Sequence, residues 1–272
     1  MAMTVKSHRY LIFRRVIQLG LLTLFIGGNY MGWNILKGNF SFSRIADTVP
    51  LADPFAVLQM LAAGFTITSE ILIGSIIILA LYWLLGGRIF CSWICPLNLV
   101  TDTALWLRRK LGITTDRIYM PRNSRYYILA MAIILSAIIG YAAFESISPI
   151  SIWFRMLIFG TGGGWAIVLA IFLLDISVKR NGWCGHICPL GAFYGVIGRW
   201  SLMKVKYKHD NCTQCMDCFK VCPEPQVLHI VTKHNGIIQS GECTNCGRCI
   251  EVCNDKALRF SVNNFKTQNH EK

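Results

Sequence analysis

The sequence predicts an α-helical membrane protein with four transmembrane helices and a small C-terminal α+β domain. Of its 272 residues, 54% are hydrophobic and only 15% are charged, whereas about a quarter of the residues of a typical soluble domain are charged. The apolar residues gather in the first 200 positions, and eight of the twelve cysteines lie between positions 212 and 253. We therefore predict a membrane domain over residues 1–200 and a second domain over residues 201–272.

Four apolar stretches make up the predicted membrane domain, at residues 10–33, 67–87, 125–145 and 156–178. Each is close to the ~20 residues with which a helix crosses a hydrocarbon core of ~30 Å. The first stretch begins like a signal peptide. However, it is too long for one and has no small-residue cleavage site, so we interpret it as an uncleaved anchor.

Basic residues predict the orientation of these helices. The connection between the second and third stretches contains Arg88, Arg108, Arg109, Lys110, Arg117, Arg122 and Arg125, and the segment after the fourth contains Lys179, Arg180, Arg199, Lys204, Lys206 and Lys208. The other two connections are poor in basic residues. By the positive-inside rule, both termini and the C-terminal domain face the cytoplasm of a bacterial inner membrane. The net charge of +13 thus reflects topology. Nucleic-acid binding is not expected, because no recognition module accompanies the charge.

The C-terminal cysteines form two runs of the pattern Cys-x2-Cys-x2-Cys-x3-Cys. The runs are Cys212, Cys215, Cys218 and Cys222, then Cys243, Cys246, Cys249 and Cys253. This spacing is typical of bacterial-type ferredoxins with two [4Fe–4S] clusters, in which the fourth cysteine of each run ligates the other cluster. We therefore assign Cys212, Cys215, Cys218 and Cys253 to one cluster, and Cys243, Cys246, Cys249 and Cys222 to the second. Zinc usually takes separated Cys-x2-Cys pairs, and disulfides are disfavoured in the cytoplasm.

The remaining pattern of the C-terminal domain fits a small ferredoxin. Residues 203–207 alternate as a strand, and residues 257–260 form a closing strand. Asn235-Gly236 is a hairpin signal between residues 227–231 and 236–238.

The other four cysteines occur in two matching motifs of the membrane half. Cys91 and Cys95 stand in Phe-Cys-Ser-Trp-Ile-Cys-Pro-Leu, and Cys184 and Cys188 stand in Trp-Cys-Gly-His-Ile-Cys-Pro-Leu. Each motif follows an even-numbered apolar stretch. Upstream of each, Asp53-Pro54-Phe55 and Ser148-Pro149-Ile150 occupy corresponding places. The membrane half therefore consists of two parallel helix-pair repeats, as in several membrane protein folds.

Two interpretations of the Cys-x3-Cys pairs stay open. Residues four apart share a helix face, so the two sulfurs of a pair could bind metal or form a reducible disulfide. Alternatively, they are inert buried thiols, because free cysteine packs like a small hydrophobe. Their symmetric occurrence favours a redox or metal role, which makes Cys91, Cys95, Cys184 and Cys188 the candidate catalytic residues. All four together could hold one further cofactor.

Histidine and aspartate are the other residue types that could serve a function within the membrane. No pair of histidines lies inside the apolar stretches, and no Cys-x2-Cys-His occurs, so neither a transmembrane b-type haem nor a c-type haem is expected. Asp175 stands four residues before Lys179. We expect these two to form an ion pair near the membrane surface; a proton-handling role for Asp175 is the alternative.

Taken over the whole chain, these motifs resemble the polyferredoxin-like membrane proteins, and within them the NapH family of ferredoxin-type quinol dehydrogenase membrane components. The stretches that carry the resemblance are residues 160–165 (Gly-Thr-Gly-Gly-Gly-Trp) and residues 182–195, around the second Cys-x3-Cys-Pro motif. Members that serve nitrous oxide reductase carry an additional flavin-binding region, for which this chain has no room.

The resemblance implies a function in anaerobic respiration. It implies that electrons pass from quinol in the membrane toward a periplasmic nitrate reductase, with a soluble ferredoxin-type partner subunit (NapG in that system). It marks the eight C-terminal cysteines as cluster ligands and the Cys-x3-Cys pairs as functional, but it identifies no quinol-site residue. The alternative is a polyferredoxin-type maturation factor that reduces a metal or a thiol on a client respiratory enzyme.

Overall fold

The computed structural model describes residues 8–33, 35–113, 115–160 and 163–263. The chain folds into two compact units. The cysteine-rich unit comprises residues 1–17, 81–93 and 194–272, and the helical unit comprises residues 18–80 and 94–193. These units differ in their bounds from the predicted domains, residues 1–200 and 201–272, which stay a prediction. Residues 161–162 of the glycine-rich stretch quoted above lie outside the described residues.

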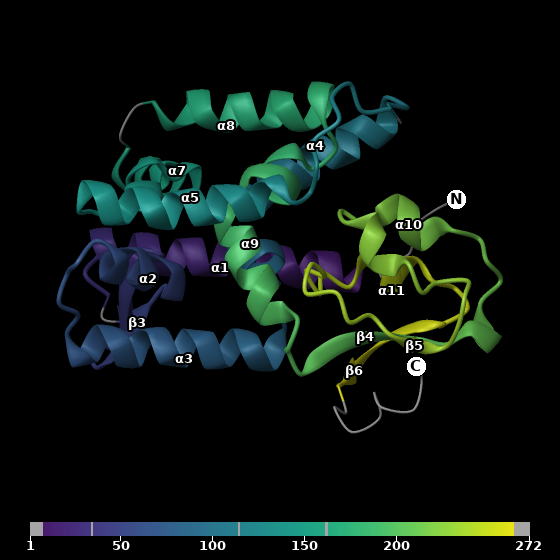
Figure 1. The fold of residues 1–272 in the computed structure, drawn as a ribbon, viewed down its shortest axis with the longest axis horizontal. Helices are drawn as coiled ribbons and strands as arrows, with labels where there is room; N and C mark the ends of the chain where they lie inside the picture. The colour runs from purple at the N-terminus through teal and green to yellow at the C-terminus, as the bar shows by residue number, and fades with distance from the viewer. Residues whose placement is uncertain (1–7, 34, 114, 161–162, 264–272) are drawn as a thin grey trace. The chain divides into compact units, whose positions relative to one another are not determined.

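The first 200 residues are mostly helical, as predicted (Figure 1). The helices are α1 (Arg9–Tyr30), α2 (Pro54–Ala62), α3 (Ser69–Leu85), α4 (Leu97–Lys110), α5 (Ser124–Ile139), α6 (Ala143–Ile147), α7 (Pro149–Phe159), α8 (Gly164–Leu173) and α9 (Pro189–Gly198). The described residues also form the π-helical turns η2 (Phe90–Ile94), η3 (Leu174–Val178) and η4 (Trp183–Ile187).

The order of elements repeats, as the matching motifs predict. Pro54 opens α2 and Pro149 opens α7, each at a first helical position where the missing N–H costs nothing. Asp53 also caps α2, since its carboxylate accepts the Ala56 amide at 3.1 Å. In each half an apolar helix comes next, α3 or α8, and a π turn that contains the first cysteine of the pair precedes a further helix, α4 or α9.

One described helix is long and apolar enough to cross a membrane by length and composition. It is α1, whose 22 residues extend for about 33 Å. The shorter apolar helices cover Ser69–Leu85, Ser124–Ile139, Pro149–Ile158, Gly164–Val178 and Pro189–Gly198. Four of these helices, all but Pro189–Gly198, overlap the second, third or fourth apolar stretch. That these stretches span the membrane remains a proposal.

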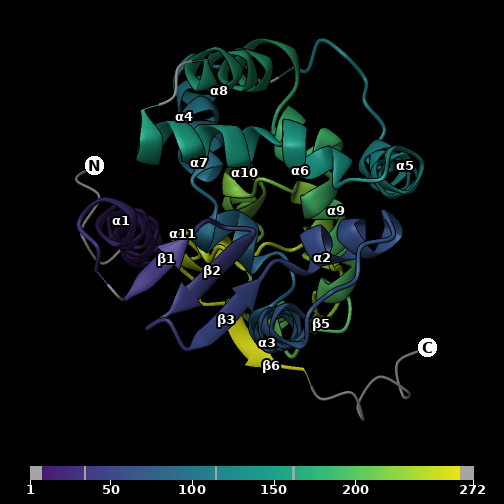
Figure 2. The ribbon, with the colours of Figure 1, turned by 90° about the vertical axis from the view of Figure 1, so that its left-hand side faces the viewer.

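A three-stranded antiparallel sheet that the sequence did not predict lies between α1 and α2 (Figure 2). It consists of β1 (Leu36–Gly38), β2 (Phe42–Ile45) and β3 (Val49–Ala52). The turn from β1 to β2 is tight because the Asn39 side chain accepts the amides of Ser41 and Phe42. Phe40 in this turn packs against Phe154 of α7, with ring centroids 4.4 Å apart and the ring planes tilted by 53°. That contact fixes the sheet to the helices.

The C-terminal part of the cysteine-rich unit has the predicted α+β composition. Its sheet has the order β5-β4-β6, from β4 (Met203–Tyr207), β5 (Gly236–Ile237) and β6 (Leu258–Val262), and two short helices, α10 (Asp217–Val221) and α11 (Arg248–Val252), pack together (Figure 1). The predicted strand at 203–207 is confirmed, and the closing strand begins one residue later than predicted. The predicted hairpin is wrong: β5 pairs with β4, while Pro225–Leu228 forms a 3₁₀ turn, η6.

Candidate iron–sulfur centres

The structure places the eight C-terminal cysteines around two separate cavities. The first cavity is lined by Cys212, Cys215, Cys218 and Cys253, and the second by Cys222, Cys243, Cys246 and Cys249. We call these sets the first and second cysteine groups. Each draws three thiols from one run and the fourth from the other run. The cavities are similar in size, with empty volumes of about 350 and 370 Å³.

The two loops that present these thiols share one backbone conformation. Gln214 and Asn245 stand two residues after the first cysteine of each run, and their φ angles are 58° and 48°. Met216 and Gly247 follow the second cysteine, with φ angles of 61° and 76°. Left-handed conformations at non-glycine residues are uncommon and cost energy, and they gather at functional sites. The repeated strain indicates that both loops are shaped for the same kind of ligand.

Burial distinguishes the two groups. In the second group Cys222, Cys246 and Cys249 are all buried. In the first group only Cys218 is buried, and Cys215 is exposed. The first centre is therefore the more accessible of the two from solvent.

Burial and crowding also make the thiols poor acids. Burial raises the pKa of the Cys218 and Cys243 thiols to about 11, and neighbouring cysteines add to the effect. Burial likewise raises the pKa of Cys222 and Cys249. Four crowded thiolates need positive charge to compensate them, and iron ions supply it in a cluster. The donor set of each cavity thus fits an iron–sulfur cluster.

The first Cys-x3-Cys motif contacts the loop of the second group. The Ser92 hydroxyl donates to the Thr244 carbonyl at 2.6 Å, and the Trp93 indole N–H donates to the Asn245 carbonyl at 3.1 Å. Thr244 and Asn245 lie between Cys243 and Cys246. The residues directly after Cys91 are therefore hydrogen-bonded to the backbone that carries two thiols of the second group.

Buried charges surround the same loop. Arg88 and Glu224 form an ion pair at 3.3 Å, with side chains 1% and 2% exposed. Arg88 also donates to the Glu242 carbonyl at 3.0 Å. Lys204 of β4 is 2% exposed. This arrangement was not predictable from the sequence, because Arg88 and Lys204 both belong to the basic set that predicts membrane topology.

Each Cys-x3-Cys pair begins on a π turn. Cys91 and Cys184 are inside η2 and η4, and Cys95 and Cys188 come directly after Ile94 and Ile187. In both pairs the first thiol is partly exposed and the second is buried. In η4 the Cys188 amide donates to the Trp183 carbonyl at 2.9 Å, which is the i to i−5 bond of a π turn. Such turns are frequent at functional sites, so the matched geometry supports a shared role for the two pairs.

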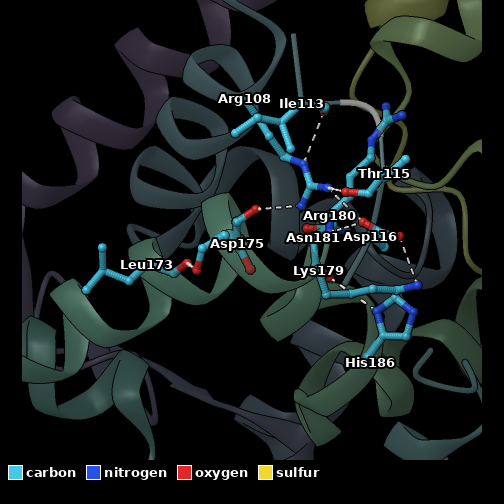
Figure 3. Close-up of polar contacts among 11 residues, drawn as sticks. Arg108, Ile113, Thr115, Asp116, Leu173, Asp175, Lys179, Arg180, Asn181 and His186 are labelled. Atoms are coloured by element: carbon cyan, nitrogen blue, oxygen red, sulfur yellow. Dashed lines mark hydrogen bonds and ion pairs between the residues drawn. The ribbon is translucent and has the colours of Figure 1, made fainter. Parts of the chain in front are cut away.

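The polar network beside η4 differs from the expected Asp175–Lys179 pair (Figure 3). Lys179 pairs with Asp116 at 2.9 Å instead, and Arg108 reaches the same carboxylate at 2.9 Å. The expectation is wrong because the helix ends at Val178 and Lys179 has extended backbone, so it does not share a helix face with Asp175.

Asp116 and Asp175 have different surroundings. Burial alone would raise the pKa of the Asp116 carboxyl, but the Arg180 amide and the charges of Lys179 and Arg108 together lower it. Asp175 is fully buried. Its Oδ1 accepts the Trp183 amide at 3.2 Å, and the structure shows no hydrogen-bond partner for its Oδ2 among the described residues. Asp175 therefore helps to position the start of the second cysteine motif.

Two protein-family models match the chain. One, described as a 4Fe-4S binding domain, matches residues 70–114 and 157–208, which include both Cys-x3-Cys motifs. The other, described as a 4Fe-4S dicluster domain, matches residues 204–254, which include the eight C-terminal cysteines. These matches establish that the chain carries 4Fe-4S ferredoxin domains.

Curated proteins are similar to the chain over most of its length. The ferredoxin-type protein NapH of Escherichia coli is 46% identical over 82% of this chain and 78% of its own. NapH of Haemophilus influenzae is 44% identical over 94% and 91%. The methylamine utilization ferredoxin-type protein MauN of Methylorubrum extorquens is 45% identical over 88% and 84%.

No solved structure matches the chain. The resemblance to the NapH family is nevertheless confirmed by the identity and coverage of these relatives. The chain belongs to the family of ferredoxin-type proteins that includes NapH and MauN, and it is an iron–sulfur electron-transfer protein.

Proposed function

We propose that this protein is a membrane-bound electron-transfer subunit that takes electrons from quinol and passes them, through partner subunits, toward a periplasmic nitrate reductase. The observation that carries the proposal is the arrangement of eight cysteines as two groups of four around two cavities. The similarity to NapH supports the choice of reductase.

Each cysteine group holds one [4Fe–4S] cluster in this proposal. Cys212, Cys215, Cys218 and Cys253 ligate one, and Cys243, Cys246, Cys249 and Cys222 ligate the other. A bound cluster supplies one-electron transfer over a wide range of potentials. The match to a dicluster model supports the count of two.

Burial of the cysteines differs between the two centres, and this difference determines which centre a partner protein can reach. The buried thiols of the second group exclude water from that centre, while exposed Cys215 leaves the first centre open to a soluble ferredoxin-type partner. Quinol binds in the helical part, between apolar helices, as ligands of helix bundles commonly do. The four apolar stretches form spans with both clusters on the cytoplasmic side of the inner membrane.

A gene deletion tests the proposal in intact cells. Quinol-dependent nitrate reduction is expected to fall strongly when the gene is deleted and to recover when it is supplied again. A C243S variant is expected not to restore it, whereas the exposed-surface variant K208M is expected to do so. Undiminished nitrate reduction, in cells with no parallel quinol route, would contradict the proposal.

A second candidate function rests on the two matched Cys-x3-Cys pairs, in each of which the first thiol lies on a π turn and is partly exposed. In this case the protein delivers electrons during the maturation of a client enzyme, and the Cys-x3-Cys pairs bind the metal or thiol that is reduced. Copper binding by the purified protein that disappears in a C91S/C184S variant would favour this function. Neighbouring genes for a molybdenum nitrate reductase would favour the first.

A further inference from the structure

A further cavity lies in the helical unit, where the sheet β1–β3 meets the start of α3. Its empty volume is about 740 Å³, about twice that of either cysteine cavity. Small-molecule sites commonly have volumes of about 300–1,000 Å³. The residues that line it come from all three strands, from the turn between β2 and β3, and from α3. We call this cavity the sheet groove.

Two glycines bring helices directly against the edges of the sheet (Figure 2). A Cβ at Gly28 of α1 would lie 1.8 Å from the carbonyl oxygen of Leu36 in β1. A Cβ at Gly74 of α3 would lie 2.9 Å from the carbonyl oxygen of Pro50 in β3. Neither position has space for a side chain, so helix and strand backbones are in contact at both edges. Backbone packing therefore fixes the walls of the sheet groove.

The sheet groove has an apolar floor and a charged rim. The side chains of the floor are buried or half-buried: Phe42, Pro50, Leu51, Ala52 and Ile71. The rim consists of two ion pairs, Lys37 with Asp47 at 3.0 Å and Arg44 with Glu70 at 2.6 Å. An apolar cavity with a few convergent polar groups is typical of a site for a small organic ligand.

The rim places like charges side by side. Lys37 and Arg44 are directly opposite each other on β1 and β2, and like charges in that position destabilise a sheet. Each cation has a carboxylate partner, which it contacts through one oxygen, Oδ2 of Asp47 or Oε2 of Glu70. For the second oxygen of each carboxylate, the structure shows no hydrogen-bond donor among the described residues. The rim thus presents two acceptors and two donors to a ligand.

We propose that the sheet groove binds the ring of a quinol, with Asp47 and Glu70 accepting hydrogen bonds from its two hydroxyl groups. A quinol donates two hydrogen bonds and the quinone accepts two, so a site for both redox forms needs both kinds of partner. Carboxylates only accept, whereas Lys37 and Arg44 only donate. The inference rests on the proposed function, within which it narrows the quinol site to one groove.

The surface beside the sheet groove suits the apolar tail of a quinol. Leu72, Ile73 and Ile76 follow Ile71 on α3 and are 49%, 53% and 55% exposed. They belong to the apolar stretch 67–87, which faces lipid in the proposed topology. In the same topology the sheet lies on the periplasmic side. The ring therefore binds at the periplasmic surface of the inner membrane, and the tail lies along α3 in the lipid.

The test is photolabelling of the full-length protein, purified anaerobically in detergent with its clusters, by a short-chain azidoquinone. Mass spectrometry is expected to find the label on peptides that contain residues 42–52 or 70–76, and excess unlabelled short-chain quinone is expected to remove it. L51W fills the floor of the groove and is expected to lose most of the label. I138W adds the same ring on α5, at a residue that is 76% exposed, and is expected to keep the label.

A second variant tests the rim without a change of volume. D47N/E70Q removes both acceptor charges, and the concentration of short-chain quinol that displaces the label is expected to rise about tenfold. Folding is expected to be unaffected, because exposed ion pairs contribute little to stability. This variant therefore decides the role of the rim even if L51W does not fold.

The outcomes separate the sheet groove from the proposed function. Competed label elsewhere in the chain, unchanged by L51W, would overturn the groove and leave the proposed function standing. Label in the groove that unlabelled quinone does not remove would indicate a general lipid site and would also overturn the inference. Absence of competed label would overturn the groove alone if quinol still reduces the clusters, and the proposed function as well if it does not.

Discussion

At the scale of single residues, the buried pair of Arg88 and Glu224 connects the start of the first cysteine motif to the second cysteine group. Arg88 stands three residues before Cys91, and Glu224 stands two residues after Cys222. Gln226 donates to the carboxylates of both Glu224 and Glu242, each at 2.8 Å. This polar network therefore joins segments that are far apart in the sequence.

Removing the charge of Glu224 is expected to destabilise the cysteine-rich unit. E224Q retains the side-chain volume but leaves the guanidinium of Arg88 opposite a neutral amide, and breaking a buried ion pair from one side costs about 3–5 kcal/mol. Thermal unfolding of the purified protein would show this as a lower midpoint.

The matched control is the exposed pair of Lys220 and Asp217, whose side chains are 70% and 43% exposed. D217N is expected to leave the free energy of unfolding nearly unchanged, because exposed ion pairs contribute little to stability. Equal effects of E224Q and D217N would show that burial of the Arg88–Glu224 pair has no energetic consequence.

At the scale of elements, the loops that follow the first cysteine of each run, around Met216 and Gly247, can be compared with each other. They have the same backbone conformation, but the position after the second cysteine is Met216 in one loop and Gly247 in the other. Only glycine adopts positive φ without cost. In addition, a Cβ at Gly247 would lie 2.6 Å from Cγ of Tyr10, so this position has no space for a side chain.

Substitutions at these two positions are expected to have opposite effects. M216G relieves the left-handed strain and is expected to leave stability unchanged or to raise it by about 1 kcal/mol. G247A introduces both strain and a clash, and is expected to lower stability and cluster content. Thermal unfolding and iron analysis measure the two effects. Loss of iron in M216G but not in G247A would contradict the shared loop conformation.

The four predicted membrane spans lead to a testable prediction of how the chain is oriented in the membrane. If residues 10–33, 67–87, 125–145 and 156–178 all cross the membrane, a fluorescent protein fused to the C-terminus is expected to fold in the cytoplasm. Alkaline phosphatase inserted in the connection between α1 and α2 is expected to be active in the periplasm. An active phosphatase at the C-terminus would reverse the predicted orientation.

At the scale of the whole molecule, the sequence predicted the features that depend on residues close together in the chain. The cysteine spacing predicted the two groups of thiols that the structure brings together, and alternation predicted β4. The sheet β1–β3 was missed because its strands are short and lack clear alternation.

Features that depend on distant segments were not predictable in the same way. The ion pair of Lys179 depends on Asp116, which is far away in sequence. The buried site of Lys204 depends on carbonyls from residues 198, 199 and 239. The π turns at both cysteine motifs could not be predicted from hydrophobic periodicity either, because a single i to i−5 turn leaves no repeating pattern of apolar residues.

The central claim is that the chain carries two [4Fe–4S] clusters on the two cysteine groups. Its most direct test is iron and acid-labile sulfide analysis of the anaerobically purified protein, with Mössbauer spectroscopy to identify the cluster type. The account predicts about eight irons and about eight sulfides per chain, all in cubane clusters, falling to about four of each when Cys243 and Cys246 are replaced by alanine. Bound zinc in place of iron, or about twelve irons with a third cluster, would contradict it.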